Sequence, residues 1–119
     1  MITNFEEVTQ ELNKQELEIL PLVIQGFKRY NEKNPIKSDV IILRMNEFLK
    51  TKNYKIKITG PRLRKFVNHI RTNSMLPLIA TSNGYFVTEN KEIIASQISS
   101  LIERANSIDR CAQGLKEFL

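Results

Sequence analysis

Apolar residues recur at intervals of three and four along the first half of the chain, which is the spacing of one face of an α-helix. Asn13 and Glu16 have the spacing of a capping box, which predicts that a helix begins there. Pro21 is expected either to kink this helix or to mark its first turn. The apolar face of the helix is predicted to contain Leu20, Val23, Ile24 and Phe27.

Two further helices are predicted before residue 73. Ser38 is expected to cap a helix that continues to about Lys50, and Thr59 to cap another that continues to about Thr72, with Pro61 in its first turn. Lysine and apolar residues alternate over 52–58, a pattern that fits either a strand or a connection between helices. The expected buried positions are Ile41, Met45, Phe48 and Leu49 in the first of these helices and Leu63, Phe66, Val67 and Ile70 in the second.

The segments around these helices have shorter patterns. Residues 31–35 have the composition of a loop, and residues 35–37 are expected to be extended. Phe5, Val8 and Leu12 are spaced as on a helix, so residues 1–12 are expected to form an N-terminal extension with a short helix of its own.

Two short β-prone runs, at 78–81 and 85–88, flank the sequence Ser-Asn-Gly at 82–84. Asn followed by Gly is a strong indication of a hairpin turn. Because two strands are unstable alone, the hairpin is expected to pack on the helices. Side chains alternate between the two faces of a strand, and we expect Phe86 to face the core and either Tyr85 or the turn at Asn83 and Gly84 to lie near a bound partner.

A long helix is predicted from about Asn90 to Leu119, where the only helix-disfavouring residue is Gly114. Its apolar positions are spaced alternately by four and three residues, which is the heptad pattern of a coiled coil. We expect this seam to form a homodimer, either parallel or antiparallel, although close packing of the helix on its own domain also fits the small alanines. The expected dimerisation residues are Ile94, Ile98, Leu101, Ala105, Ile108, Ala112 and Leu115.

Charge is unevenly distributed along the 119 residues. The net charge is +5, yet residues 48–88 contain eight Lys and Arg and no Asp or Glu, while both flanking segments are slightly acidic. Like charges in proximity repel, so eight cations without acidic neighbours favour a polyanionic partner, and we expect nucleic acid. The predicted third helix places Lys65, Asn68 and Thr72 opposite its apolar stripe, with Arg62, Arg64, His69 and Arg71 at the margins.

These residue types suit double-stranded DNA. Lysine and arginine neutralise phosphates, and Asn68 can bind adenine through two hydrogen bonds. His69 has no acidic residue near it in sequence and is not expected to act as a catalytic base. The candidate DNA-contacting residues are Lys55, Lys57, Thr59, Arg62, Arg64, Lys65, Asn68, His69, Arg71, Thr72, Ser82 and Asn83.

The segment Ile58-Thr-Gly-Pro-Arg-Leu-Arg-Lys-Phe-Val-Asn-His-Ile-Arg, followed by Leu76-Pro-Leu-Ile-Ala-Thr-Ser-Asn-Gly-Tyr-Phe, is similar to small winged-helix proteins of bacterial viruses and prophages. The resemblance covers about residues 11–88. It implies a mainly α fold with a small β-hairpin wing, here a winged helix-turn-helix domain over 1–88 followed by the long helix at 89–119. It also implies that the third helix enters the major groove and that the wing contacts the DNA backbone or minor groove.

The expected function is therefore that of a sequence-preferring DNA-binding protein, either a transcriptional regulator or an accessory replication factor. The alternative is a protein-interaction module whose basic face docks an acidic partner. One cysteine and one histidine argue against disulfides and metal sites, no motif indicates an enzyme or a cofactor, and no apolar run suggests a membrane span or a signal peptide. A cytoplasmic location is expected, in a bacterial host if the protein is phage-encoded.

Overall fold

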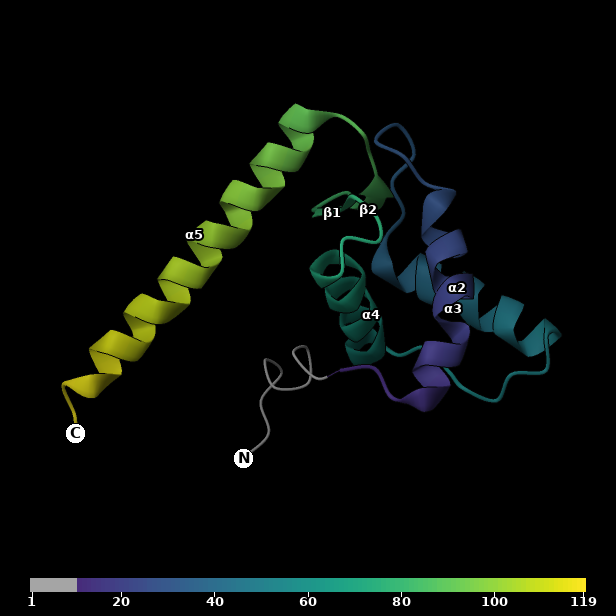
Figure 1. Cartoon of the computed structure of the whole chain (residues 1–119), viewed down its shortest axis with the longest axis horizontal. Coiled ribbons are helices and arrows are strands. Elements are labelled where there is room, and N and C mark those ends of the chain that lie inside the picture. The colour runs from purple at the N-terminus through teal and green to yellow at the C-terminus, as the bar shows by residue number, and fades with distance from the viewer. Residues whose placement is uncertain (1–10) are drawn as a thin grey trace. The chain divides into compact units, whose positions relative to one another are not determined.

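The computed structural model describes residues 11–119. These contain helix α2 (Lys14–Lys28), helix α3 (Ser38–Thr51), helix α4 (Gly60–Thr72), strands β1 (Leu78–Thr81) and β2 (Gly84–Val87), and helix α5 (Lys91–Lys116) (Figure 1). The described residues are thus mainly helical with one two-stranded antiparallel sheet and a long C-terminal helix, as the sequence predicted. The chain divides after Thr88 into two compact units.

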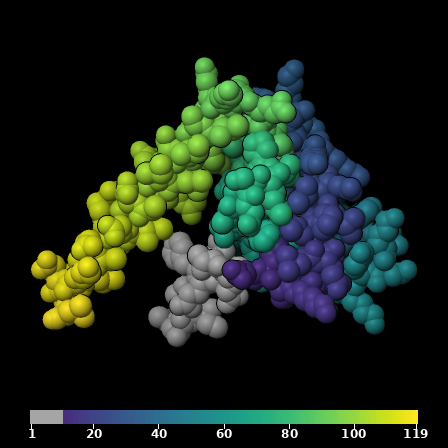
Figure 2. Space-filling view, viewed as in Figure 1, coloured from purple at the N-terminus to yellow at the C-terminus, as the bar shows by residue number. Residues whose placement is uncertain are grey.

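Helices α2, α3 and α4 and one face of the hairpin enclose a cluster of buried apolar side chains. In the space-filling view, residues 11–88 form one continuous body over this cluster (Figure 2). All four apolar positions expected on the buried stripe of α4 are buried, and Phe27 of α2 is completely enclosed. Leu12 is buried against this cluster without being helical, while Phe5 and Val8 lie outside the described residues.

Helix α2 begins as predicted, with both hydrogen bonds of the capping box present between Asn13 and Glu16. Pro21 lies inside the helix at an exposed position and not in its first turn.

Helix α3 begins one residue earlier than predicted. Its N-cap is Lys37, which offers no side-chain cap, and Ser38 is already helical. The reason is the preceding residue: Ile36 forms an isolated antiparallel bridge with Tyr85, with N–H···O distances of 2.9 and 2.8 Å in the two directions. This bridge holds the chain extended up to the start of the helix, and it agrees with the extended segment expected at 35–37. Phe48, expected to be buried, is 38% exposed.

Residues 52–58 form a connection and not a strand. The connection is fixed at both ends. Asn53 adopts the left-handed conformation (φ 64°), and the N–H of Tyr54 bonds to the carbonyl of Leu49, which closes α3. The amide of Asn46 donates to the Ile58 carbonyl (2.9 Å) and accepts from the Ile58 N–H (2.7 Å). Helix α4 then begins and ends as predicted, with Thr59 capping the N–H of Arg62.

The hairpin occurs at the predicted position, with Thr81 paired to Gly84 and a turn at Ser82 and Asn83. The turn is not the Asn-Gly type that the sequence suggested, because Gly84 is the first residue of β2 and has φ +120°. A Cβ at Gly84 would lie 2.2 Å from the carbonyl oxygen of Ile36. Glycine is therefore required where the hairpin meets the extended segment before α3.

The hairpin does not direct Tyr85 as expected. The Tyr85 ring packs edge-on against Phe27, with 5.7 Å between ring centroids, and contacts the helical core. Phe86 is buried as expected, but the alternation of a strand places it with its partner Ile79 on the opposite face. Of the two alternatives for a partner contact, the one that used Tyr85 is wrong, because its ring packs against the helical core, and the turn at Asn83 and Gly84 stays a prediction.

Helix α5 begins at the N-cap Asn90, whose side chain accepts hydrogen bonds from two N–H groups of the first turn, and none of its residues is buried. Ile98, Leu101, Ile108 and Leu115 of the predicted seam are all exposed. Cys111, which is next to Ala112 of the predicted seam, is exposed as well.

Candidate nucleic-acid interface

Helix α4 presents polar side chains on the side opposite its buried stripe, but these side chains differ in how freely they reach solvent. Arg64 and Thr72 are exposed, whereas Asn68 and His69 are half-buried. The side chains of Arg62 and Lys65 are only 30% and 14% exposed. The predicted polar side of α4 therefore has two margins, one with Arg62 and Lys65 and the other with Arg64, Asn68 and Thr72.

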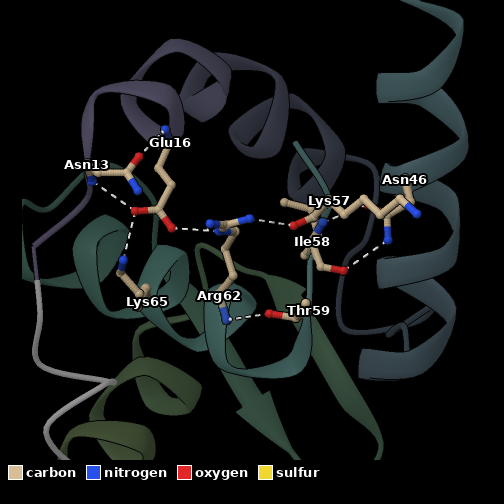
Figure 3. Close-up of polar contacts among 8 residues, drawn as sticks. All are labelled: Asn13, Glu16, Asn46, Lys57, Ile58, Thr59, Arg62 and Lys65. Atoms are coloured by element: carbon tan, nitrogen blue, oxygen red, sulfur yellow. Dashed lines mark hydrogen bonds and ion pairs between the residues drawn. The ribbon is translucent and has the colours of Figure 1, made fainter. Parts of the chain in front are cut away.

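One margin is occupied by Glu16 of α2 (Figure 3). The Glu16 side chain is completely buried, and its two oxygens accept bonds of 2.8 Å from Arg62 Nε and Lys65 Nζ. One of these oxygens also accepts the N–H of Asn13 at 2.8 Å. Arg62 Nη1 donates in addition to the carbonyl of Lys57 at 2.8 Å. These bonds join α2, the connection before α4, and α4 itself.

The environment of Glu16 favours its charged form. Burial acts to raise the pKa of the carboxyl, but the hydrogen bonds from Lys65, from the backbone of Asn13 and from Arg62 outweigh it, and the pKa lies below its ordinary value. A carboxylate that is fully enclosed and bonded to two cations is a structural group, because no atom of it is left for a ligand.

The expectation that all eight cations of residues 48–88 lack acidic partners is therefore wrong for Arg62 and Lys65. The acid that pairs with them lies 46 and 49 residues earlier in the chain. In the sequence, Glu16 is fully accounted for by the capping box, so nothing indicated that its second role would be to hold α4.

The other margin of α4 carries Arg64, Asn68 and Thr72, each about 40° from the next around the helix when each residue advances the helix by about 100°. Arg71, next to this margin, is half-buried and its Nε donates to the carbonyl of Leu78 at 2.9 Å, so it ties α4 to β1. Arg64 is thus the exposed cation of α4, and Asn68 and Thr72 extend the same margin.

The lysines around the α3–α4 connection are exposed, at positions 50, 52, 55 and 57. Lys52 lies over the Phe48 ring, with Nζ 5.6 Å from the ring centroid. Thr59 uses its hydroxyl oxygen to cap α4. Of the sequence candidates here, Lys55 and Lys57 are free to extend into solvent, whereas Thr59 has a structural role.

The turn of the hairpin exposes Ser82 and Asn83, as the sequence suggested. Lys37, which was not among the candidates, donates from Nζ to the carbonyl of Ser82 at 2.6 Å. The Ile36–Tyr85 bridge brings this lysine to the hairpin from 45 residues away. A cation therefore lies at the turn, although the hairpin sequence itself contains none.

Other kinds of site find no support in the residues from 11 onward. These residues contain no group of three His, Cys, Asp or Glu side chains that can hold a metal ion. None of the helices in the same range is long and apolar enough to cross a membrane. No protein-family model, curated protein or solved structure matches the chain.

Proposed function

We propose that the protein binds double-stranded DNA through the exposed margin of α4 and the turn of the hairpin. In support, the order of elements is that of a winged helix: α2, the extended residue Ile36 bridged to the hairpin, α3, α4 and then β1 and β2. In this arrangement α4 corresponds to the helix that enters the major groove, and the turn at Ser82 and Asn83 corresponds to the wing.

The single observation that carries the proposal is the chemistry of the free margin of α4. Its 13 residues span about 20 Å, and the buried stripe is already used by the core. The free margin offers a guanidinium, an amide and a hydroxyl at Arg64, Asn68 and Thr72. Arginine can bind guanine and asparagine can bind adenine through pairs of hydrogen bonds in the major groove.

Phosphate contacts are proposed for the lysines beside this margin, at Lys55 and Lys57, and for Lys37 at the hairpin turn. Arg62 and Lys65 are both bonded to Glu16, and the three side chains together carry a net charge of +1. We therefore propose that Arg62 and Lys65 act mainly by holding α4 in place. His69 and Arg71 lie at the edges of the surface, where they can contact the DNA backbone.

The test is fluorescence anisotropy of a labelled duplex at several salt concentrations. Each phosphate contact should contribute about 0.9 to the slope of log affinity against log salt concentration. Arg64→Ala is expected to weaken binding about tenfold or more, and Asn68→Ala to reduce the preference between sequences. Arg29→Ala removes an exposed arginine elsewhere on the domain and serves as the matched control. Affinity that does not fall with salt, or equal losses for Arg64→Ala and Arg29→Ala, would refute the proposal.

We propose further that α5 pairs with a second copy of the chain. An isolated helix gains little stability from its backbone alone, and α5 has 26 residues of which none is buried. A parallel pair would place Arg104 of one copy near Asp109 of the other, at flanking positions of the seam. Leu101→Asp should convert a dimer into a monomer in light scattering, while Ser107→Asp, on the polar side, should not. A wild-type monomer at high concentration would contradict the dimer.

Such a dimer would present two copies of α4 to a palindromic or repeated site, as a transcriptional regulator or an accessory replication factor does. The alternative is an acidic protein partner. It is favoured by a groove beside α3 whose wall combines exposed Leu43 and Tyr54 and half-buried Ile56 with three lysines and one acid, Glu47. Affinity for duplex DNA that is no greater than for other polyanions would favour this alternative.

A further inference from the structure

A cavity of about 80 Å³ lies between α2 and α3 and opens to solvent. Its wall is made by α2, by Arg29 and Tyr30 directly after it, and by α3, and neither α4 nor the hairpin contributes to it. The cavity is therefore separate from every residue proposed above to contact DNA. The apolar part of the wall consists of Leu22, Val23, Ile41, Met45, Phe48 and Leu49.

The cavity exists because α2 has a glycine where it faces α3. A Cβ at Gly26 would lie 3.1 Å from the terminal methyl of Met45, so any larger residue would narrow the space. Glycine inside a helix costs about 0.5–1 kcal/mol relative to alanine. The backbone at Gly26 is ordinary helix and does not require glycine. The residue thus lowers helix stability and leaves space between the helices.

The rim of the cavity is positively charged. Arg29 and Arg44 both line it, and no acidic residue does. Arg44 Nη1 donates to the hydroxyl of Tyr30 at 2.7 Å, which holds the guanidinium at the opening. Among the ion pairs formed by residues 11–119, none involves either arginine. Two guanidinium groups therefore lie beside an apolar cavity with their charge unpaired.

We propose that this cavity binds a small carboxylate with a short branched apolar body. The apolar wall fits the hydrocarbon part, and guanidinium groups bind carboxylates with favourable geometry through paired hydrogen bonds. A cavity of about 150 Å³ encloses benzene. This one is about half as large and is open to solvent, which suits a short body of about four carbon atoms, such as that of 3-methylbutanoate, with the carboxylate at the rim. The carboxylate would lie at the solvent-exposed opening of a cavity that both Arg29 and Arg44 line.

The test uses 3-methylbutanoate and its uncharged counterpart 3-methylbutanamide, titrated to about 10 mM into the ¹⁵N-labelled full chain, because ligands of this size bind weakly. The expected result is a saturable shift of the amide resonances of Gly26, Tyr30 and Arg44 with the acid. The amide should bind at least tenfold more weakly. Arg44→Met should reduce the affinity for the acid about tenfold and leave that for the amide unchanged, whereas the exposed Arg64→Met should change neither.

A second variant tests the shape of the site without removing charge. Gly26→Ala fills part of the cavity while improving the helix, so it should bind the acid at least fivefold more weakly and remain folded, as its thermal melt reports. Equal affinities for the acid and the amide, no saturable shift at these residues, or unchanged affinity in Arg44→Met would overturn the proposal. None of these outcomes depends on whether the chain binds DNA.

Discussion

Replacing Glu16 with glutamine removes one buried negative charge and keeps a side chain of nearly the same shape. Glutamine also serves in capping boxes, so the bond with Asn13 is retained. Arg62 and Lys65 lose their charged partner. A hydrogen bond to a charged group contributes about 1.5–3 kcal/mol, and we reduce the sum of the two by about half because both cations can turn toward water. The expected loss in the free energy of unfolding at pH 7 is about 1.5–3 kcal/mol.

The loss should depend on pH with a definite sign. Because the pKa of Glu16 is lower in the folded than in the unfolded chain, its contribution is present above the unfolded pKa of about 4.3 and disappears as the pH falls through the folded pKa. The difference between wild type and Glu16→Gln should therefore be full at pH 7 and should shrink progressively below about pH 4.

The assay is urea denaturation followed by circular dichroism at pH 7 and pH 3. Glu18→Gln is the matched control, because Glu18 lies on the same helix, is exposed and should change the free energy of unfolding by less than about 0.5 kcal/mol. Equal effects of the two substitutions at pH 7, or a deficit of Glu16→Gln that persists undiminished at pH 3, would refute the role given to Glu16.

Three further substitutions test other contacts by the same denaturation assay. Gly84→Ala should destabilise by about 3 kcal/mol or more, because it forces a Cβ against the Ile36 carbonyl at a φ that alanine rarely adopts. Gly114→Ala should instead stabilise α5 by about 0.5–1 kcal/mol, since a Cβ there meets nothing within 4 Å. If Gly84→Ala and Gly114→Ala changed the free energy of unfolding in the same direction, both arguments would be contradicted. Asn46→Ala should cost about 2 kcal/mol by leaving the N–H and carbonyl of Ile58 without partners, and no change would show that the connection does not need this clamp.

The features that sequence predicted well are those determined by residues close together in the chain. The start of α2 follows from a capping box of four residues, and the start of α4 follows from Thr59 and Pro61. The stripe of α4 follows from helical periodicity alone. In each case, the groups that decide the structure are separated by less than about two helical turns.

The features that were missed depend on contacts between distant residues. The bridge between Ile36 and Tyr85 moves the N-cap of α3 and reverses the expected orientation of Tyr85, and it joins residues 49 positions apart. The pairing of Glu16 with Arg62 and Lys65 spans a similar separation. Local patterns identify which residues are charged or apolar, but they do not show which distant partner each one meets.

The most direct test of the central claim is the set of amide resonances that move when an unlabelled duplex is added to the ¹⁵N-labelled chain. DNA binding through the free margin of α4 predicts that the largest shifts fall on residues 64–72 and 82–83. These shifts should be lost in the double variant that carries both Arg64→Ala and Asn68→Ala. Shifts confined to α2 and the outer side of α3, or no shifts at low salt, would contradict it.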